Sequence, residues 1–197
     1  MTDSTRREQP SAVPASDLRE SGVAEPAHSS FHDDFVRWFE TDASRLVRFL
    51  TRLSGEPDLA ADLVQRAFIQ LYRRGAMPDS PGAWLISVAL NLFRNEKTTR
   101  SRRLRLLTPA RGEHSVADPP QSPDEAAGAE DVKRGVRAAL ERLPEREQRL
   151  LLLQAEGYRY REIAVALELN EASVGVLLAR ARRKFRAAYE EVSDASR

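Results

Sequence analysis

The chain has 197 residues, of which 41% are apolar and 31% charged, with a net charge of only +1, so one medium domain or two small ones would fit. It contains no cysteine, which excludes disulfides, thiolate metal sites and a cysteine nucleophile. The N-terminus is polar and acidic, unlike a signal peptide, and no apolar run approaches the roughly 20 residues that span a bilayer. We therefore expect a cytoplasmic protein without membrane insertion. Sparse aromatic residues (7%) and few glycines (9) favour an all-α fold.

The first half of the chain has the pattern of a small helical domain. Residues 1–30 are rich in Ser, Pro and acidic residues, and we expect a disordered tail there. Apolar residues then recur at helical spacing from Phe31 to Leu53, with a break at Thr41–Asp42 left open. "SGEPD" predicts a turn, and helices are expected from Pro57 and from about Pro81. Residues 31–107 thus form a predicted domain of three or four helices.

The second half predicts another helical domain after a linker. Residues 108–130 are rich in Pro, acidic and small residues, which is typical of a flexible linker. A helix over 131–143 is expected to end at Pro144, and "EREQRLLLLQAEG" predicts a helix closed by Gly157. "YRYREIAVALEL", a turn and a helix over 171–190 complete the predicted domain, residues 131–192.

"REIAVALELNEASVGVLLARARRKF" has the pattern of a helix-turn-helix. The small Ala164 fits a close helix crossing, and Asn170 is placed to accept a hydrogen bond from the first turn of the second helix. An ordinary antiparallel helix pair shows similar spacing. The basic run at 180–186 favours DNA binding, because cations near phosphates gain affinity from counterion release.

Two sets of motifs, in order, resemble a known family. "ALERLPEREQRLLLLQAEGYRYREIAVALELNEASVGVLLARARRKF" resembles region 4 of a bacterial RNA polymerase sigma factor. Upstream, "RLSGEPDLAADLVQRAFIQLY" and "AWLISVALNLFRNE" are similar to region 2 of the same family. With only regions 2 and 4, the chain resembles the extracytoplasmic-function (ECF) group. The resemblance implies a sigma region 2 helical bundle and a sigma region 4 helix-turn-helix, and a protein that directs core RNA polymerase to promoters and starts transcription.

The resemblance implies a contact with core RNA polymerase along the "DLVQ" helix. Asp62 and Gln65 share an outer flank of that helix, so they are the favoured contacts, whereas Val64 and Phe68 also fit a core role. Arg66 stands where the family usually has Glu. The predicted polymerase-binding residues are Asp62, Leu63, Val64, Gln65 and Phe68.

The resemblance also implies that the helix beginning near Pro81 binds the −10 element and captures a base flipped out of it. Asn91 and Asn95 lie at i and i+4, and an Asn amide can both donate to and accept from a base edge. A helix cap or a solvent-facing amide is the alternative interpretation of an isolated Asn. Basic residues after them would hold phosphates. The predicted −10 residues are Asn91, Arg94, Asn95, Lys97, Arg100, Arg102 and Arg103.

The last helix is expected to bind the −35 element with little direct base reading. Basic or polar residues are common in related helices at the positions of Gly175, Val176 and Leu177, and here they are absent. Backbone N–H groups, DNA shape and a contact of Val176 with thymine methyls remain available. The predicted −35 residues are Ser173, Val176, Arg180, Arg182, Arg183 and Lys184.

No catalytic or metal-binding pattern is found, so we expect no enzyme activity and no cofactor; the three histidines are isolated. Promoter DNA, core RNA polymerase and an anti-sigma factor are the expected partners. Two other hypotheses compete with the sigma factor. One is a sigma-like decoy that binds an anti-sigma factor without reading DNA, and the other is a free-standing helix-turn-helix regulator, against which the "DLVQ" helix argues.

Overall fold

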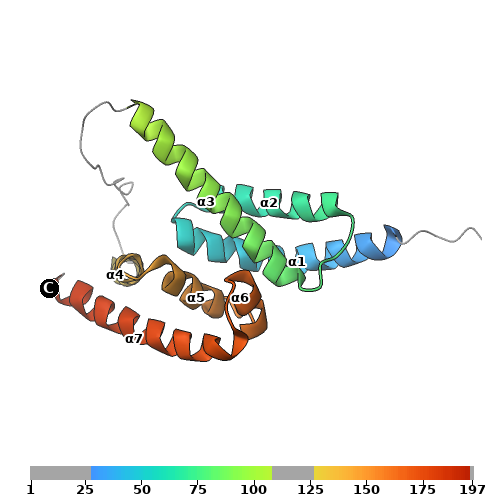
Figure 1. The fold of residues 1–197 in the computed structure, drawn as a ribbon. Helices are drawn as coiled ribbons and strands as arrows, with labels where there is room; N and C mark the ends of the chain where they lie inside the picture. The colour runs from blue at the N-terminus through green and yellow to red at the C-terminus, as the bar shows by residue number, and fades with distance from the viewer. Residues whose placement is uncertain (1–27, 108–126, 196–197) are drawn as a thin grey trace, which may run out of the picture.

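The computed structural model describes residues 28–107 and 127–195, which form seven helices and no strand, as the all-α expectation requires. The predicted tail and linker lie outside these residues, except that helices begin at His28 and at Ala127. Figure 1 shows the arrangement. The helices are α1 (His28–Ser54), α2 (Pro57–Arg74), α3 (Pro81–Leu107), α4 (Ala127–Glu141), α5 (Glu145–Ala155), α6 (Tyr160–Ala166) and α7 (Glu171–Ala195).

The first half is a bundle of three helices, in which α2 packs against both α1 and α3. Helix α1 is continuous, so the break considered at Thr41–Asp42 is wrong. Thr41 keeps the helix intact because its hydroxyl donates to the carbonyl of Arg37 one turn earlier, at 2.8 Å. Asp42 is buried and accepts a hydrogen bond from Arg45 at 2.5 Å, which satisfies its charge inside the helix.

In the second half, α4 and α5 pack against the long helix α7. Helix α5 ends in a Schellman motif around Gly157, whose φ of 80° suits glycine. The N–H of Gly157 donates to the carbonyl of Gln154 at 3.0 Å, and that of Tyr158 to the carbonyl of Leu153 at 3.1 Å. The predicted closure of this helix by Gly157 is thus confirmed, and the turn brings Tyr158 into the core, where it is 4% exposed.

Helices α6 and α7 form the predicted helix-turn-helix. Ala164 is buried at the crossing, and its carbonyl accepts a hydrogen bond from the N–H of Leu169 in the turn, at 2.8 Å. Asn170 Oδ1 accepts a hydrogen bond from the N–H of Ala172 at 2.9 Å, so the predicted N-cap of α7 is confirmed. Val174 and Leu178 are completely buried and seal α7 onto α6.

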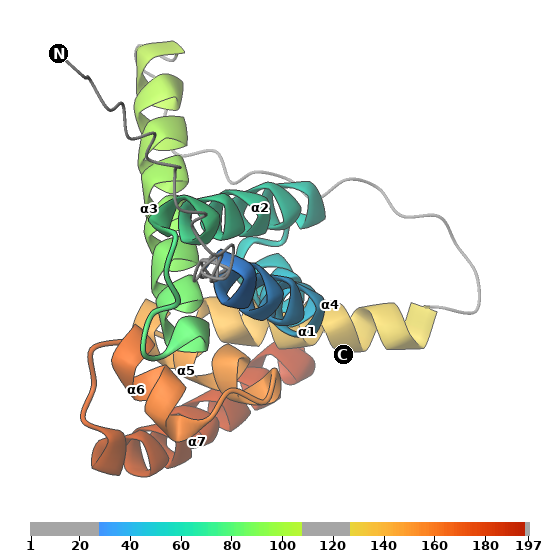
Figure 2. The same cartoon turned by 90° about the vertical axis from the view of Figure 1, so that its right-hand side faces the viewer.

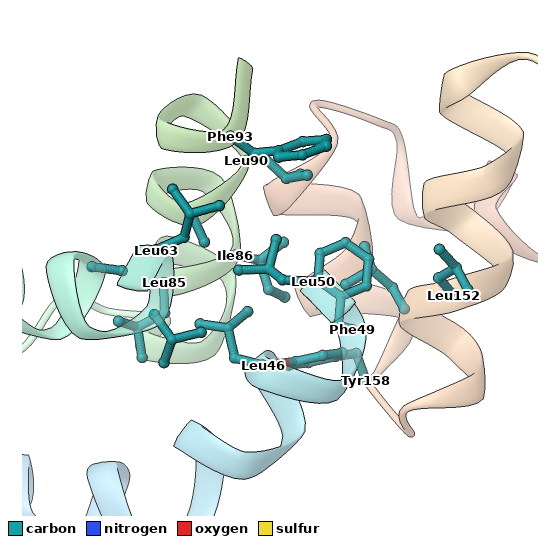
Figure 3. Packing of buried hydrophobic residues seen from close by; sticks show 14 of the residues in the cluster. Leu46, Phe49, Leu50, Leu63, Leu85, Ile86, Leu90, Phe93, Leu152 and Tyr158 are labelled. Atoms are coloured by element: carbon teal, nitrogen blue, oxygen red, sulfur yellow. The ribbon is translucent and has the colours of Figure 1, made fainter. Parts of the chain in front are cut away.

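The two halves pack against each other through one hydrophobic cluster. Helix α5 contacts α1, and α6 contacts α3. Figure 3 shows Phe49 of α1 between side chains of α2 and α3 on one side and Leu152 of α5 on the other, with Tyr158 close by. The C-terminal part of α3 projects beyond this cluster, away from the other helices (Figures 1 and 2). The two expected helical domains are therefore present and also joined by a shared core.

Candidate nucleic-acid interface

The predicted −10 surface begins in the middle of α3. Both asparagines are exposed, while their neighbours Leu92 and Phe93 are buried and anchor the helix. Asn91 Oδ1 accepts a hydrogen bond from Arg94 Nη1 at 3.1 Å. This bond engages the amide oxygen of Asn91 and places a guanidinium beside the amide.

The basic side chains further along α3 fall into two groups. Lys97 and Arg100 are paired with carboxylates: Lys97 Nζ lies 3.4 Å from Glu145 of α5, and Arg100 Nη1 lies 2.6 Å from Glu56. The hydrogen bond with Glu56 raises the pKa of Arg100 above its usual value. Arg102 and Arg103 are exposed on the projecting end, and among the described residues the structure gives them no hydrogen bond or ion pair. The projecting end therefore carries the basic side chains of α3 that are most open to a ligand.

A groove of about 370 Å³ separates the asparagine-bearing face of α3 from the second half. Asn91 and Arg94 line one wall. The other wall carries Arg146 and Arg149 of α5 and residues 166–168 after α6, including the carboxylate of Glu168. Asn91 and Arg94 therefore lie at the edge of this groove and are at the same time exposed to solvent.

The predicted polymerase-binding helix is α2, and burial divides its five predicted residues. Leu63, Val64 and Phe68 are at most 3% exposed, so they cannot contact polymerase directly in this arrangement. Their role is structural, because they hold α2 in the bundle. Asp62 and Gln65 are exposed, and Ile69 and Tyr72 are 41% and 55% exposed on the same flank. The ring of Phe39 from α1, which is 48% exposed, packs against the buried ring of Phe68, with 5.1 Å between the ring centres.

Asp62 on this flank forms an ion pair with Arg66 of the same helix. Arg66 Nη1 lies 3.3 Å from Asp62 Oδ2, one helical turn away. An exposed pair of this kind contributes about 0.2–1 kcal/mol, so it does not prevent Asp62 from contacting another protein.

The predicted −35 residues lie along the exposed side of α7. Ser173 is exposed near the N-terminus of the helix, and Val176 is 73% exposed. Arg180 and Arg183 are exposed, and within residues 28–107 and 127–195 the structure assigns them no hydrogen bond or ion pair.

The other two predicted basic residues of α7, Arg182 and Lys184, contact α5. Arg182 donates to Gln154 at 2.5 Å, and Lys184 Nζ lies 2.7 Å from Glu147. Lys184 is thereby partly used in holding α7 to α5. Arg180 and Arg183 are the cations of this group that remain fully available.

Three arginines that the sequence analysis did not single out connect the halves. They follow one face of α1 at positions 45, 48 and 52, spaced by three and four residues. Arg48 Nε lies 2.9 Å from Glu156 Oε2, and Arg52 also pairs with Glu156, whose side chain is 3% exposed. In the sequence, the only signals of this contact are the spacing of the arginines on α1 and the position of Glu156 after the leucines of α5. No local pattern indicates that these two segments pair with each other.

The third arginine lies at the centre of a buried polar group. The Arg45 guanidinium carbon lies 3.8 Å from the centre of the Tyr158 ring, and its Nη2 lies 3.9 Å from Glu162. Burial raises the pKa of the Asp42 carboxyl, against the attraction of Arg45. Burial likewise raises the pKa of Tyr158 to about 12. Asp42 and Tyr158 are only 5% and 4% exposed, so little water reaches them where α1 meets the second half.

Within the described residues, no group of three or more His, Asp or Glu side chains is arranged to hold a metal ion. Over the same part of the chain, no helix combines the length and the apolar character needed to cross a membrane.

The described geometry is a three-helix bundle with an amide-bearing basic helix, followed by a helix-turn-helix with a basic second helix. Both parts match family models from one class of transcription-initiation protein. The family model described as Sigma-70 region 2 matches residues 38–103, and that described as Sigma-70, region 4, matches residues 133–185. Both matches lie inside the predicted domains.

Two relatives of known family place the chain in one group of sigma factors. The chain is 32% identical over 169 residues to the ECF RNA polymerase sigma factor EcfG of Rhodopseudomonas palustris, covering 82% of this chain and 86% of the relative. It is 28% identical to the ECF RNA polymerase sigma factor SigE of Mycolicibacterium smegmatis, over 90% of this chain and 69% of the relative. The chain belongs to the ECF family of RNA polymerase sigma factors, and its function is in transcription initiation.

One further relative supports the same family, and one solved structure shares the fold. A probable RNA polymerase sigma factor, RfaY of Xanthomonas campestris, is 33% identical over 66% of this chain, which spans only 34% of that relative. Among solved structures, the sigma factor RpoE of Bartonella quintana, crystallised with the anti-sigma factor NepR, has a TM-score of 0.59 at 22% identity, covering 80% of this chain and 98% of that one. At this identity the structural likeness shows the fold.

Proposed function

We propose that this sigma factor divides promoter recognition between α3 and α7 and binds core RNA polymerase through the exposed flank of α2. The observation that carries the proposal is the presence, in one chain, of regions 2 and 4 with exposed basic side chains on both DNA-facing helices. Asp62 and Gln65 make the polymerase contact, and the buried Leu63, Val64 and Phe68 hold them in position.

At the −10 element, α3 captures a base that has left the stack. Unstacking costs a few kcal/mol, which a fitting pocket offsets. The amides of Asn91 and Asn95 bind the base edge, with Arg94 beside Asn91. Arg102 and Arg103 on the projecting end, together with Lys97 and Arg100, hold the phosphates.

At the −35 element, α7 binds mainly phosphate and DNA shape. The N-terminus of the helix, with Ser173, faces a phosphate, and the 73% exposed Val176 meets thymine methyl groups. Arg180 and Arg183 bind further phosphates, with smaller contributions from Arg182 and Lys184, because these two are partly engaged with α5.

The protein itself is not an enzyme in this proposal: the polymerase performs the chemistry in the cytoplasm, and the sigma factor supplies binding and base capture. An anti-sigma factor is a further proposed partner. Its support is the fold shared with RpoE of Bartonella quintana, which was crystallised with one.

The decisive experiment mixes the protein with core RNA polymerase and measures initiation from genomic fragments. The variant Asp62→Ala/Gln65→Ala should lose polymerase binding, while Asp194→Ala, an exposed acid at the end of α7, should retain it. Absence of a stable complex with the wild-type chain would refute the proposal. A complex that never initiates would favour the decoy.

A second pair of variants tests the −10 assignment. Asn91→Ala/Asn95→Ala should reduce initiation by about tenfold or more without loss of polymerase binding, since each good base contact contributes about 1–3 kcal/mol. Thr99→Ala, on an exposed position of the same helix, is the matched control. Equal initiation by both variants would remove the role of the asparagines.

A further inference from the structure

The groove between α3 and α5 gathers positive charge from both helices, which lie side by side in Figure 2. Arg94 of α3 and Arg146 and Arg149 of α5 line it, and Glu168 is the one carboxylate among the described residues of its walls. The lining therefore has a net charge of +2. We call this feature the arginine groove and define it by Asn91, Arg94, Arg146, Arg149 and Glu168.

The acidic residues at the start of α5 do not neutralise Arg146. Glu145 lies 2.7 Å from Arg149, and Glu147 lies 2.7 Å from Lys184 of α7. Arg146 is exposed, and in the part of the chain that the structure describes it forms no hydrogen bond or ion pair. It also lies in the first turn of α5, where the helix dipole adds positive potential. Its guanidinium is thus available to an anion.

Arg149 is only partly satisfied by the protein. Its side chain is 16% exposed, and its Nη2 contacts Glu145. Its Nε is buried and has no hydrogen-bond partner among the described residues. Buried polar groups nearly always have a partner. This unpaired donor, an observation independent of the net charge, points to a ligand that brings acceptor oxygens.

The size and the other walls of the groove fit a nucleotide. Its volume of about 370 Å³ lies at the lower end of the range for small-molecule sites. Leu90, Ala166 and Leu167 give it an apolar part, and the Glu168 carboxylate can accept hydrogen bonds from the N–H groups of a base. Three guanidinium groups around one small volume suit the adjacent negative charges of a diphosphate or triphosphate, because each can donate several hydrogen bonds to phosphate oxygens.

We propose that the arginine groove binds the diphosphate or triphosphate group of a free nucleotide. Arg94, Arg146 and Arg149 hold the phosphates, and the nucleoside lies along the apolar part of the groove. A bound nucleotide thereby contacts α3 and α5 together. The inference goes beyond the proposed function, in which Arg146 and Arg149 bind neither the −10 nor the −35 element.

Isothermal titration calorimetry of the full chain with inorganic pyrophosphate and with ADP tests the site. Arg94→Gln and Arg146→Gln should each weaken the binding of both probes by about tenfold, because each removes charge-assisted hydrogen bonds. Arg134→Gln on α4 makes the same change of charge at an exposed position outside the groove and should bind like the wild type. Glu168→Gln should strengthen binding, because it removes the opposing charge.

The four substitutions are at exposed positions, so they should preserve folding, as circular dichroism would show. The site would be overturned if the wild type bound neither probe, or if Arg134→Gln reduced binding as much as Arg146→Gln. The apolar part of the groove should make ADP bind more tightly than pyrophosphate. Equal affinities would overturn the assignment to a nucleotide.

Fluorescence anisotropy with a random-sequence single-stranded oligonucleotide separates a free nucleotide from a DNA strand as the source of the phosphates. Arg146→Gln should leave DNA affinity nearly unchanged while it weakens ADP binding. A loss of DNA affinity with unchanged ADP binding would overturn the proposal in favour of a DNA strand. Failure of the wild-type chain to initiate with core polymerase would refute the proposed function and leave these titrations standing, because they contain no polymerase.

Discussion

The buried hydroxyl of Tyr158 predicts a specific loss of stability in alkali. Tyr158 is 4% exposed, and burial raises its pKa from 10.0 to about 12. The raised value means that the folded protein keeps the phenol proton at pH values where the unfolded chain releases it. Stability is therefore complete below about pH 10 and falls as the pH rises toward 12.

The size of the effect follows from the shift. Two pKa units correspond to about 2.7 kcal/mol once both states are fully ionised. Between about pH 9 and about pH 11.5 the same linkage predicts a loss of about 1.9 kcal/mol from this one group. The Tyr158→Phe variant has no proton to release, so it should lack that part of the loss.

Urea unfolding followed by circular dichroism at the two pH values measures the difference. Other groups also titrate in this range, so the variant must be compared with the wild type at both pH values. Tyr160→Phe, at a tyrosine that is 43% exposed, is the matched control and should keep the wild-type dependence. If Tyr158→Phe lost as much stability as the wild type, the burial of this hydroxyl between the halves would be refuted.

The remaining predictions concern the shared core, the cap of α7 and the −35 contacts. Phe49→Ala should destabilise the protein by about 3–5 kcal/mol in urea unfolding, because a completely buried phenyl ring leaves a cavity; a loss below about 1 kcal/mol would contradict its packing. Asn170→Ala should cost about 1 kcal/mol in the same assay by removing the bond to Ala172, and an unchanged midpoint would argue against the cap. Arg180→Ala should weaken −35 binding similarly for all sequences and lower the salt slope by about 1. Gly175→Arg should tighten −35 binding without changing sequence preference; a new preference would contradict the reduced reading role.

The helices were predictable because each has a local cause. Pro57 and Gly157 mark ends that the structure confirms, and Asn170 caps α7 as its position indicated. The helix expected over 131–143 ends slightly earlier, at Glu141, and Pro144 is the N-cap of α5. The break considered in α1 does not occur, because both polar side chains find hydrogen-bond partners within the helix. Thr41 donates to the carbonyl of Arg37, and Asp42 accepts from Arg45. Thr and Asp have low helix propensity, but they are compatible with a helix when their hydrogen-bond partners lie one turn away.

The candidate site was predictable in its residue types but not in its surroundings. The asparagines and arginines of α3 are exposed, and their role in binding DNA stays a prediction. The groove in front of Asn91 depends on α5 and on residues 166–168, far along the chain. Likewise, the pairing of Arg48 with Glu156 spans 108 residues and leaves no periodic signal in either segment. Burial of Val64 and Phe68 was open in the sequence because amphipathic spacing fits both a core and a docking face.

The uninterrupted length of α3 has a mechanical consequence. Its 27 residues form a rod of about 40 Å, whose base lies against the second half and whose basic tip stands free. Ser87 and Arg103 are about 24 Å apart along this rod. A tilt of about 10° at the base therefore displaces the tip by about 4 Å, close to the 3.4 Å rise of one nucleotide along a strand. A small tilt where the halves meet would thus be amplified at the far end, so the geometry makes α3 a lever for the basic side chains at its tip.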